Sequence, residues 1–439
     1  MSHKMLTHKI CIKPTPKQEQ ILWILSEKCR LLYNFALNER RQNWESNRTK
    51  PETERNYITY TTQQNNLPAL KRQFPEYFWV YSKVLQMTLR KLDADYKSFF
   101  ARWKTGDKQA RPPRFKGKNF FTTLCYNQSG FSIDTERKTI QFSHKHPSGV
   151  ALLFNLPWLS RLEGEVKQVE IFQDARHRWF VAIVRSAKVS PFVDNMLYQA
   201  IDLGITNLVT AVNMHGKFIQ IQNRRPDLYW RKKIQEVQSR RDHCKKGSHR
   251  WHFYRKKLQK MQQKLANQLR DYQHKVSKNV VENTQANTLV LGALKVKTMA
   301  RKQQLKGNSL RAQAARTLNY SVYNTGALGR FAEFLTYKAE KVGKRVARID
   351  ESYTTKTCCV CGQINDRLLS ERVIQCNCGT TLDRDKNAAV NIMVRFLLQQ
   401  SPVNREPLQA FLHGLHRHTA LPHIPRGVDS MGTPGIIQE

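Results

Sequence analysis

The sequence predicts a chain of several domains whose largest part is a mixed α/β core. Helical periodicity before residue 110 gives way to short strand-like runs, and from residue 197 strands and helices alternate. The chain has 439 residues, of which 40% are hydrophobic. That length and composition provide enough apolar side chains for two or three hydrophobic cores.

Residues 14–110 are expected to form a helical domain. Apolar side chains recur three and four residues apart along 15–44 and 84–103, as they do on the buried face of a helix. Residues 111–190 instead carry short apolar or alternating runs separated by Gly, Asn, Asp and Pro, a pattern typical of strands. We expect them to form a β-barrel-like domain to which residues 1–13 add a strand.

From residue 197 the order of elements is typical of an RNase H-like α/β core. A strand and a hairpin come first, followed by a charged helical hairpin, the strand TLVLG (288–292), a helix, a further strand and a last helix. This order predicts a mixed α/β domain over residues 197–400. The tail, residues 401–439, has several Pro, Gly and His residues and is expected to be disordered.

The charge balance favours nucleic acid as a partner. The chain has 74 Lys and Arg against 34 Asp and Glu, and a polyanion would neutralise the formal net charge of +40. On charge alone, a solvated basic surface or an anionic membrane is the alternative. The N-terminus has no apolar signal region, and the sequence has no run of about 18 apolar residues. We therefore expect no membrane partner and a cytoplasmic protein that is nucleoid-associated when bound to DNA.

Four of the nine cysteines predict a metal site. Cys358 and Cys361, then Cys376 and Cys378, form two pairs, each followed by a glycine where the chain must turn back over the metal. Two such pairs can supply the four thiolates of a tetrahedral zinc site, which leaves no open position for catalysis. We expect a structural zinc in an insertion over residues 354–381. The alternative is that these cysteines only pack against one another.

Two carboxylates stand where a different metal could bind. Asp202 ends a run of small apolar residues, so its side chain emerges from a buried strand, although an ordinary polar strand end is the alternative. Asp385 opens a helix whose Ala388 and Ala389 permit close packing on the sheet, which would hold it near Asp202. Asp383 is placed to cap that helix. Converging carboxylates on a basic protein favour Mg²⁺ and two-metal phosphodiester hydrolysis.

Five ordered motifs carry a family resemblance: AIDLGITNLVT, LGALKVKTM, FLTYKAEKVGK, TTKTCCVCG and CNCGTTLDRDKNAAVNIM. With them the chain resembles the RuvC-like nucleases of the TnpB family, the transposon-encoded, RNA-guided ancestors of type V CRISPR effectors. LYNFALNERR and RPPRFKGK extend the resemblance, which covers most of residues 5–398. It implies a helical recognition domain and a β-barrel-like wedge domain ahead of a RuvC-like nuclease domain, with the helical hairpin and the zinc knuckle inserted in the latter.

One position departs from the family pattern. Much of the family has a catalytic glutamate at the end of the strand TLVLG, where this chain has Gly292. The chain has Glu351 at the end of the next strand, and neighbouring strands lie about 4.8 Å apart. In this respect it resembles a subgroup in which a glutamate just before the TSKTC-type sequence replaces the lost one. The resemblance therefore implies that Asp202, Glu351 and Asp385 are the catalytic, Mg²⁺-binding residues.

The resemblance implies an RNA-guided, Mg²⁺-dependent DNA endonuclease with guide RNA and target DNA as partners. A nuclease-dead guided DNA binder and a zinc-containing nucleic-acid-binding protein without a guide are the alternatives. Two stretches contain basic and aromatic side chains that could bind nucleic acid: Arg111, Arg114, Lys116, Lys118, Arg250, Trp251 and Tyr254. The alternative is that these side chains are only solvated or pack inward. The sequence leaves open whether the protein is a homodimer.

Overall fold

The structure is a computed structural model, and it describes residues 2–157, 159, 164–174, 176–293, 328–365, 371–400 and 405–419. The chain forms two compact units, which divide it between residues 188 and 189. None of the described helices combines the length and the apolar character that a bilayer-spanning segment needs.

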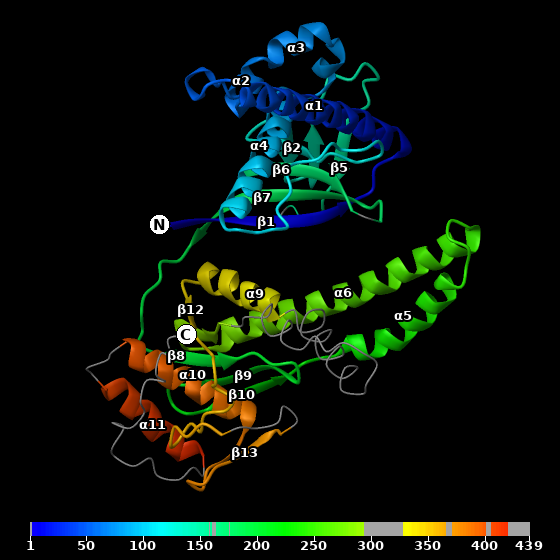
Figure 1. Cartoon of the computed structure of the whole chain (residues 1–439). Coiled ribbons are helices and arrows are strands. Elements are labelled where there is room, and N and C mark those ends of the chain that lie inside the picture. The colour runs from blue at the N-terminus through cyan, green and yellow to red at the C-terminus, as the bar shows by residue number, and fades with distance from the viewer. Residues whose placement is uncertain are drawn as a thin grey trace. The chain divides into compact units, whose positions relative to one another are not determined.

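The first unit contains the predicted helical block (Figure 1). Its elements are α1 (Pro16–Arg48), η1 (Glu52–Glu54), α2 (Tyr60–Asn65), α3 (Leu67–Gln73), η2 (Pro75–Trp79) and α4 (Ser82–Lys104). Thr15 and Gln18 begin α1 with reciprocal side-chain-to-backbone hydrogen bonds of 3.3 and 3.0 Å, a capping box. The apolar stripe predicted for α1 is confirmed as its buried face: Ile21, Leu22, Leu25, Cys29, Leu32, Tyr33 and Ala36.

Two sheets complete the first unit. The larger has the order β1 (Ser2–Ile12), β7 (Trp179–Val189), β6 (Glu165–Gln173) and β2 (Leu124–Asn127), so the N-terminal strand does join the β segment. The smaller consists of β3 (Phe131–Asp134), β4 (Thr139–Phe142) and β5 (Leu152–Asn155). Among the described residues, the domain expected to be barrel-like is thus built as two separate sheets. One hydrophobic core runs from the helices to both sheets.

The second unit is organised around a five-stranded mixed sheet. Its order is β10 (Phe218–Gln222), β9 (Asn207–Asn213), β8 (Tyr198–Asp202), β11 (Thr288–Gly292) and β12 (Arg345–Ile349). The first three strands form an antiparallel meander, and β8, β11 and β12 run parallel. The strands lie where the sequence predicted them, and the parallel set brings three strand ends to one edge of the sheet.

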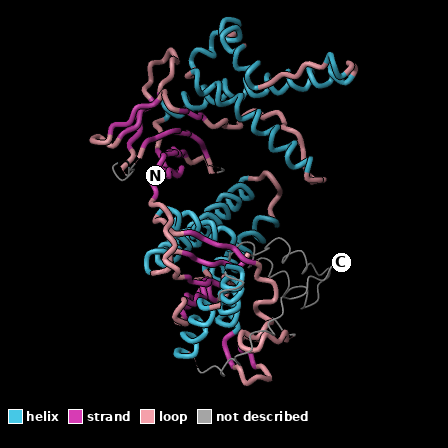
Figure 2. The backbone as a smooth tube through the Cα atoms, turned by 90° about the vertical axis from the view of Figure 1, so that its left-hand side faces the viewer, coloured by secondary structure: helices cyan, strands magenta, loops and turns pink. Residues whose placement is uncertain are grey.

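Helices cover both faces of this sheet (Figures 1 and 2). Val276, Val280 and Val281 of α6 (His249–Asn283) and Phe331 of α9 (Leu328–Lys341) pack on one face. The other face packs against α10 (Arg384–Gln400) and the C-terminal helix. The predicted helical hairpin is confirmed, because α5 (Pro226–Asp242) runs back along α6 in Figure 1.

Part of the tail is helical, so the expectation of disorder is wrong for residues 406–418. Helix α11 (Glu406–His418) buries Leu408, Phe411 and Leu415 in the core that it shares with α10. These side chains are three and four residues apart, and burial of that apolar stripe outweighs the tail's Pro and Gly content. Residues 401–404 and 420–439 of the tail lie outside the described residues.

Candidate metal centres and nucleic-acid surface

Three neighbouring parallel strands end side by side at one edge of the sheet. Leu291 of β11 is opposite Ile201 of β8, so Asp202 ends its strand beside Gly292. On the other side Gly292 is opposite Ile349, the last residue of β12. The backbone N–H of Ala293 donates to the Ile349 carbonyl at 2.7 Å, which extends the pairing beyond Gly292. The chain after β12 therefore enters the space next to Asp202.

The side chain of Glu351 fills the place that a side chain on residue 292 would take. An ideal Cβ on Gly292 would lie 2.9 Å from Glu351 Cβ and 3.1 Å from its Cδ, and still nearer to Oε2. Carbon atoms pack at about 3.5–4.0 Å, so Glu351 can adopt this position only because residue 292 is glycine. A carboxylate thus stands at the end of β11 although it belongs to the segment after β12.

Electrostatics connects this carboxylate with the other two predicted acids. Burial, together with the carboxylates of Asp385 and Glu351, raises the pKa of Asp202 to about 8 against the opposing charge of Arg384. Burial, with a contribution from Asp350, raises the pKa of Glu351 to about 7. Raised pKa values mean that the ionised carboxylates are unfavourable here, and a divalent cation bound among them would remove this electrostatic penalty. Carboxylate oxygens are also the donors that a hard cation such as Mg²⁺ prefers, so the donor set is chemically suited to this ion.

Asp385 lies in the first turn of α10. Asp383 caps this helix as predicted, because its Oδ1 accepts the backbone N–H groups of residues 385 and 386 at 3.0 and 3.1 Å. The Asp385 carboxylate accepts hydrogen bonds from Asn207 (3.1 Å) and Arg372 (3.0 Å), and Arg384 lies 3.7 Å away. The sequence did not indicate these partners, because Asn207 lies five residues after Asp202 in the motif AIDLGITNLVT and Arg372 lies in no motif, and both reach Asp385 only through the tertiary fold.

The three carboxylates gather without forming a compact ligand set. In the part of the chain that the structure describes, one group of potential ligands has its donor atoms within 4.8 Å of one another, and it consists of cysteines. Arg372 and Arg384 partly neutralise the charge of Asp385 in the absence of a metal ion. A metal bound at this edge would therefore replace the contact between Arg372 and Asp385.

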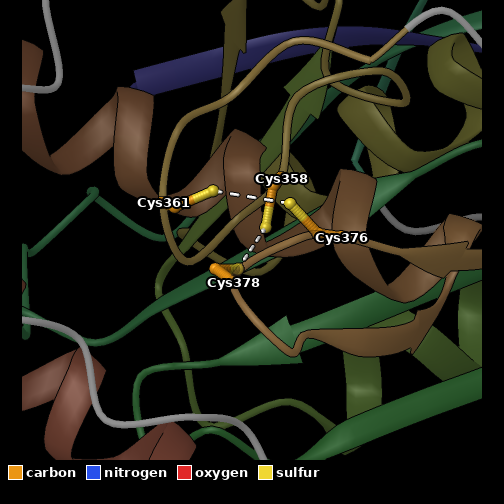
Figure 3. A group of neighbouring side chains, drawn as sticks. All are labelled: Cys358, Cys361, Cys376 and Cys378. Carbon is orange, nitrogen blue, oxygen red and sulfur yellow. Dashed lines mark hydrogen bonds between the residues drawn. The ribbon is translucent and has the colours of Figure 1, made fainter.

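The predicted cysteine pairs meet as expected. Cys358 and Cys378 have their Sγ atoms 3.7 Å apart, and Cys361 and Cys376 have theirs 3.5 Å apart (Figure 3). Four thiolates about 2.3 Å from a zinc ion form a tetrahedron whose edges are about 3.8 Å. The four-cysteine cluster therefore fits a structural zinc ion.

The loops around the cluster also match the prediction. Gly362 and Gly379 follow the second cysteine of each pair and have φ of +76° and +85°, a conformation that favours glycine. Burial raises the pKa of the Cys378 thiol, but the Thr380 hydroxyl, 3.0 Å away, the Thr380 backbone and neighbouring thiols outweigh this and lower it to about 6. This thiol is thus readily converted to the thiolate that zinc requires.

The first basic stretch is an extended loop fixed along α1. The backbone of Lys116 bonds Asn34 in both directions (2.8 and 2.9 Å), and Arg41 Nη2 donates to the Pro113 carbonyl at 2.8 Å. The exposed side chains of this loop include three of the predicted cations: Arg111, Arg114 and Lys118. Lys116 differs, because its ammonium lies 3.7 Å from the Tyr33 ring centre and burial lowers its pKa to about 8.

The second basic stretch lies near the turn of the α5–α6 hairpin. Arg250 is exposed, whereas Trp251 and Tyr254 are half-buried on α6. The guanidinium of Arg255 lies 5.3 Å from the Trp251 ring centre. The exposed aromatic surface here comes from Phe253, whose side chain is 55% accessible.

Sequence models of three families match parts of the chain. One is described as "Probable transposase" (OrfB_IS605) and matches residues 186–303, and another, "Cas12f1-like, TNB domain", matches residues 329–392. A third, "Helix-turn-helix domain" of the same OrfB_IS605 type, matches residues 1–49. The second match contains all four cysteines and Asp385.

Two relatives are similar to this chain along most of its length. "Putative RNA-guided DNA endonuclease" of Streptomyces pristinaespiralis is 28% identical over 387 residues, 87% of this chain and 86% of that protein. "Putative RNA-guided DNA endonuclease InsQ" of Escherichia coli K12 is 27% identical over 405 residues, 89% and 92% of the two chains.

The fold is also similar to that of a solved structure. The protein in "Cryo-EM structure of the Cas12f1-sgRNA-target DNA complex" superposes with a TM-score of 0.56 at 12% identity, over 86% of this chain and 83% of that one. At this identity the likeness concerns the fold alone. The three family matches make parts of the chain similar in sequence to OrfB_IS605-type and Cas12f1-like proteins, and its fold is similar to that of Cas12f1.

Proposed function

We propose that this protein is an RNA-guided DNA endonuclease of IS605 transposon origin that cuts DNA with an RNase H-like, RuvC-type core. The two relatives described above, both named "Putative RNA-guided DNA endonuclease", align along most of this chain. A net charge of +40 suits a protein that holds an RNA–DNA duplex through its phosphates while base pairing reads the sequence.

Asp202, Glu351 and Asp385 are the proposed catalytic residues. The observation that carries this assignment is the packing of Glu351 against the bare backbone of Gly292. It supplies an acid at the strand end where the chain lacks one, beside Asp202. The alternative, a nuclease-dead binder, depends on the absence of a glutamate at position 292. Glu351, in the segment after β12, provides an acid at that place and so weakens the case for this alternative.

These residues would hold Mg²⁺. When bound, Mg²⁺ supplies Lewis-acid activation of water and stabilises charge on the leaving 3′-oxygen. The chain's own contribution is to hold three carboxylates at one edge of the sheet, where Asp385 is buried and Asp202 and Glu351 are half-buried. Before a metal binds, Arg372 and Arg384 hold positive charge beside Asp385.

The remaining proposed roles concern substrate binding and structure. Arg111, Arg114 and Lys118 would contact phosphates, and Arg250 would do so at the hairpin turn. Trp251 and Tyr254 would stack on unpaired bases only if they turn outward, since both are half-buried. Lys116 mainly fastens its loop to α1, so it is a weaker candidate for phosphate binding.

One experiment separates the candidate functions. The protein is purified with its bound RNA, that RNA is sequenced, and matched target DNA is incubated with the complex in Mg²⁺ and in EDTA. We expect Mg²⁺-dependent cleavage by the wild type and loss of cleavage, with target binding kept, in Asp202→Ala and Glu351→Ala. Binding without any cleavage would indicate the nuclease-dead binder, and the absence of a defined RNA would indicate a protein without a guide.

A further inference from the structure

A short turn joins the proposed catalytic glutamate to the zinc knuckle. The Glu351 carbonyl accepts the backbone N–H of Thr354 at 3.2 Å and its hydroxyl at 2.9 Å. The backbone N–H of Thr357 then donates to the Tyr353 carbonyl at 2.9 Å, and Tyr353 itself has φ of +63°. A non-glycine residue in this region is strained and keeps its conformation only if its surroundings hold it.

Two asparagines on α10 hold that turn. Asn387 and Asn391 are one helical turn apart, and the side-chain amide of each donates to both the Thr354 and the Thr357 carbonyl, at 2.8–3.1 Å. Asn387 also accepts the backbone N–H of Cys359 at 2.9 Å, between two of the zinc-site cysteines. Asn387 is fully buried, and Asn391 and Thr354 are 8% and 3% exposed.

These four hydrogen bonds of Asn387 and Asn391, here called the clamp, connect α10 to the turn after Glu351. Asp385 lies two residues before Asn387 on the same helix, so the clamp ties the helix that carries one proposed catalytic acid to the turn that carries another. The side chain of Asn387 also holds the cysteine loop, because its oxygen accepts the backbone N–H of Cys359. Buried asparagines often satisfy nearby carbonyls for stability alone, but here four hydrogen bonds converge on two carbonyl groups of one turn.

We propose that Asn387 and Asn391 are positioning residues that keep Glu351 in place over Gly292 and thereby couple the zinc site to the magnesium site. This proposal rests on the proposed function of Glu351. It explains how an acid from the segment after β12 can serve a site at the end of β11. Partners that orient a metal ligand commonly change metal affinity by 10–100-fold when they are removed.

The test uses Asn391→Leu, a change of similar volume that leaves Asn387 to serve both carbonyls. Its matched control is Ile392→Val, which alters the neighbouring buried position on α10 and leaves both asparagines in place. Asn391→Gln, which keeps the amide, is the conservative variant, and Asn391→Ala replaces Asn391→Leu should the latter not fold. Each guide-loaded protein is assayed for Mn²⁺ affinity, target binding, single-turnover cleavage, and hydrogen exchange of residues 351–359.

In Asn391→Leu we expect faster exchange in residues 351–359, Mn²⁺ affinity lower by about tenfold or more, and a similarly slower cleavage step with unchanged target binding. Asn391→Gln should recover part of the Mn²⁺ affinity and of the cleavage rate, and Ile392→Val should keep both at the wild-type level. Wild-type Mn²⁺ affinity and cleavage rate in Asn391→Leu would overturn the coupling alone. If Asp202→Ala bound Mn²⁺ as tightly as the wild type, the proposed function would be overturned, and this proposal with it.

Discussion

Replacing Gly292 by alanine perturbs the carboxylate site with the smallest possible change. The new methyl carbon would lie 2.9 Å from Glu351 Cβ and 3.1 Å from Cδ, and nearer still to Oε2. To regain a normal contact of about 3.5 Å, the carboxylate must move by roughly 1 Å. A displacement of this size at a reacting centre costs on the order of 10²-fold in rate, or about 2.7 kcal/mol of activation free energy.

The assay is single-turnover cleavage of matched target DNA by guide-loaded protein in Mg²⁺, with target affinity measured separately. We expect Gly292→Ala to cleave about 10²-fold more slowly at unchanged target affinity. Gly329→Ala on α9 is the control, because a Cβ there meets no atom within 4 Å. Cleavage by Gly292→Ala at the wild-type rate would show that Glu351 does not need the space above Gly292 for catalysis.

Three further predictions concern stability, zinc and charge. In Mg²⁺-free buffer Asp202 and Glu351, with pKa values of about 8 and about 7, keep protons that the unfolded chain has lost. Stability against denaturant should therefore fall as pH rises from about 4 to about 8, and Asp202→Asn should flatten this slope; equal slopes would contradict it. Cys378→Ser should release zinc, lower the melting temperature and weaken Mn²⁺ binding, and a melting temperature equal to that of wild type would argue against a structural zinc. Arg114→Ala should reduce the slope of log K against log salt for nucleic acid by about 1, whereas Lys116→Ala should chiefly lower the melting temperature; the reverse pattern would show that Lys116 is the phosphate ligand.

Much of the fold could be predicted because its signals are local. The stripe of α1, the strand TLVLG and the α5–α6 hairpin each follow from spacing within a few residues. The cysteine pairs could be predicted for the same reason, since each pair and its glycine form one tight turn. The helix α11 carries an equally local apolar stripe, but the composition of the tail led to the wrong expectation.

The details of the candidate site could not be predicted, because they depend on contacts between distant segments. Sequence placed Glu351 near the end of β11 only through a resemblance, whereas its packing on Gly292 depends on the register of two strands. The clamp left a faint local signal, since Asn387 and Asn391 are four residues apart and lie on one helix face. Their shared acceptors are on another element, however, and no spacing in α10 reveals them. Burial of Lys116 against α1 is likewise a tertiary effect.

The most direct test of the central claim is anomalous diffraction from Mn²⁺ in crystals of the protein bound to guide RNA and target DNA. We expect Mn²⁺ peaks in direct contact with carboxylate oxygens of Asp202, Asp385 and Glu351. Peaks bound by Asp202 and Asp385 with the Glu351 side chain turned away, or no peak at this edge of the sheet, would contradict the central claim.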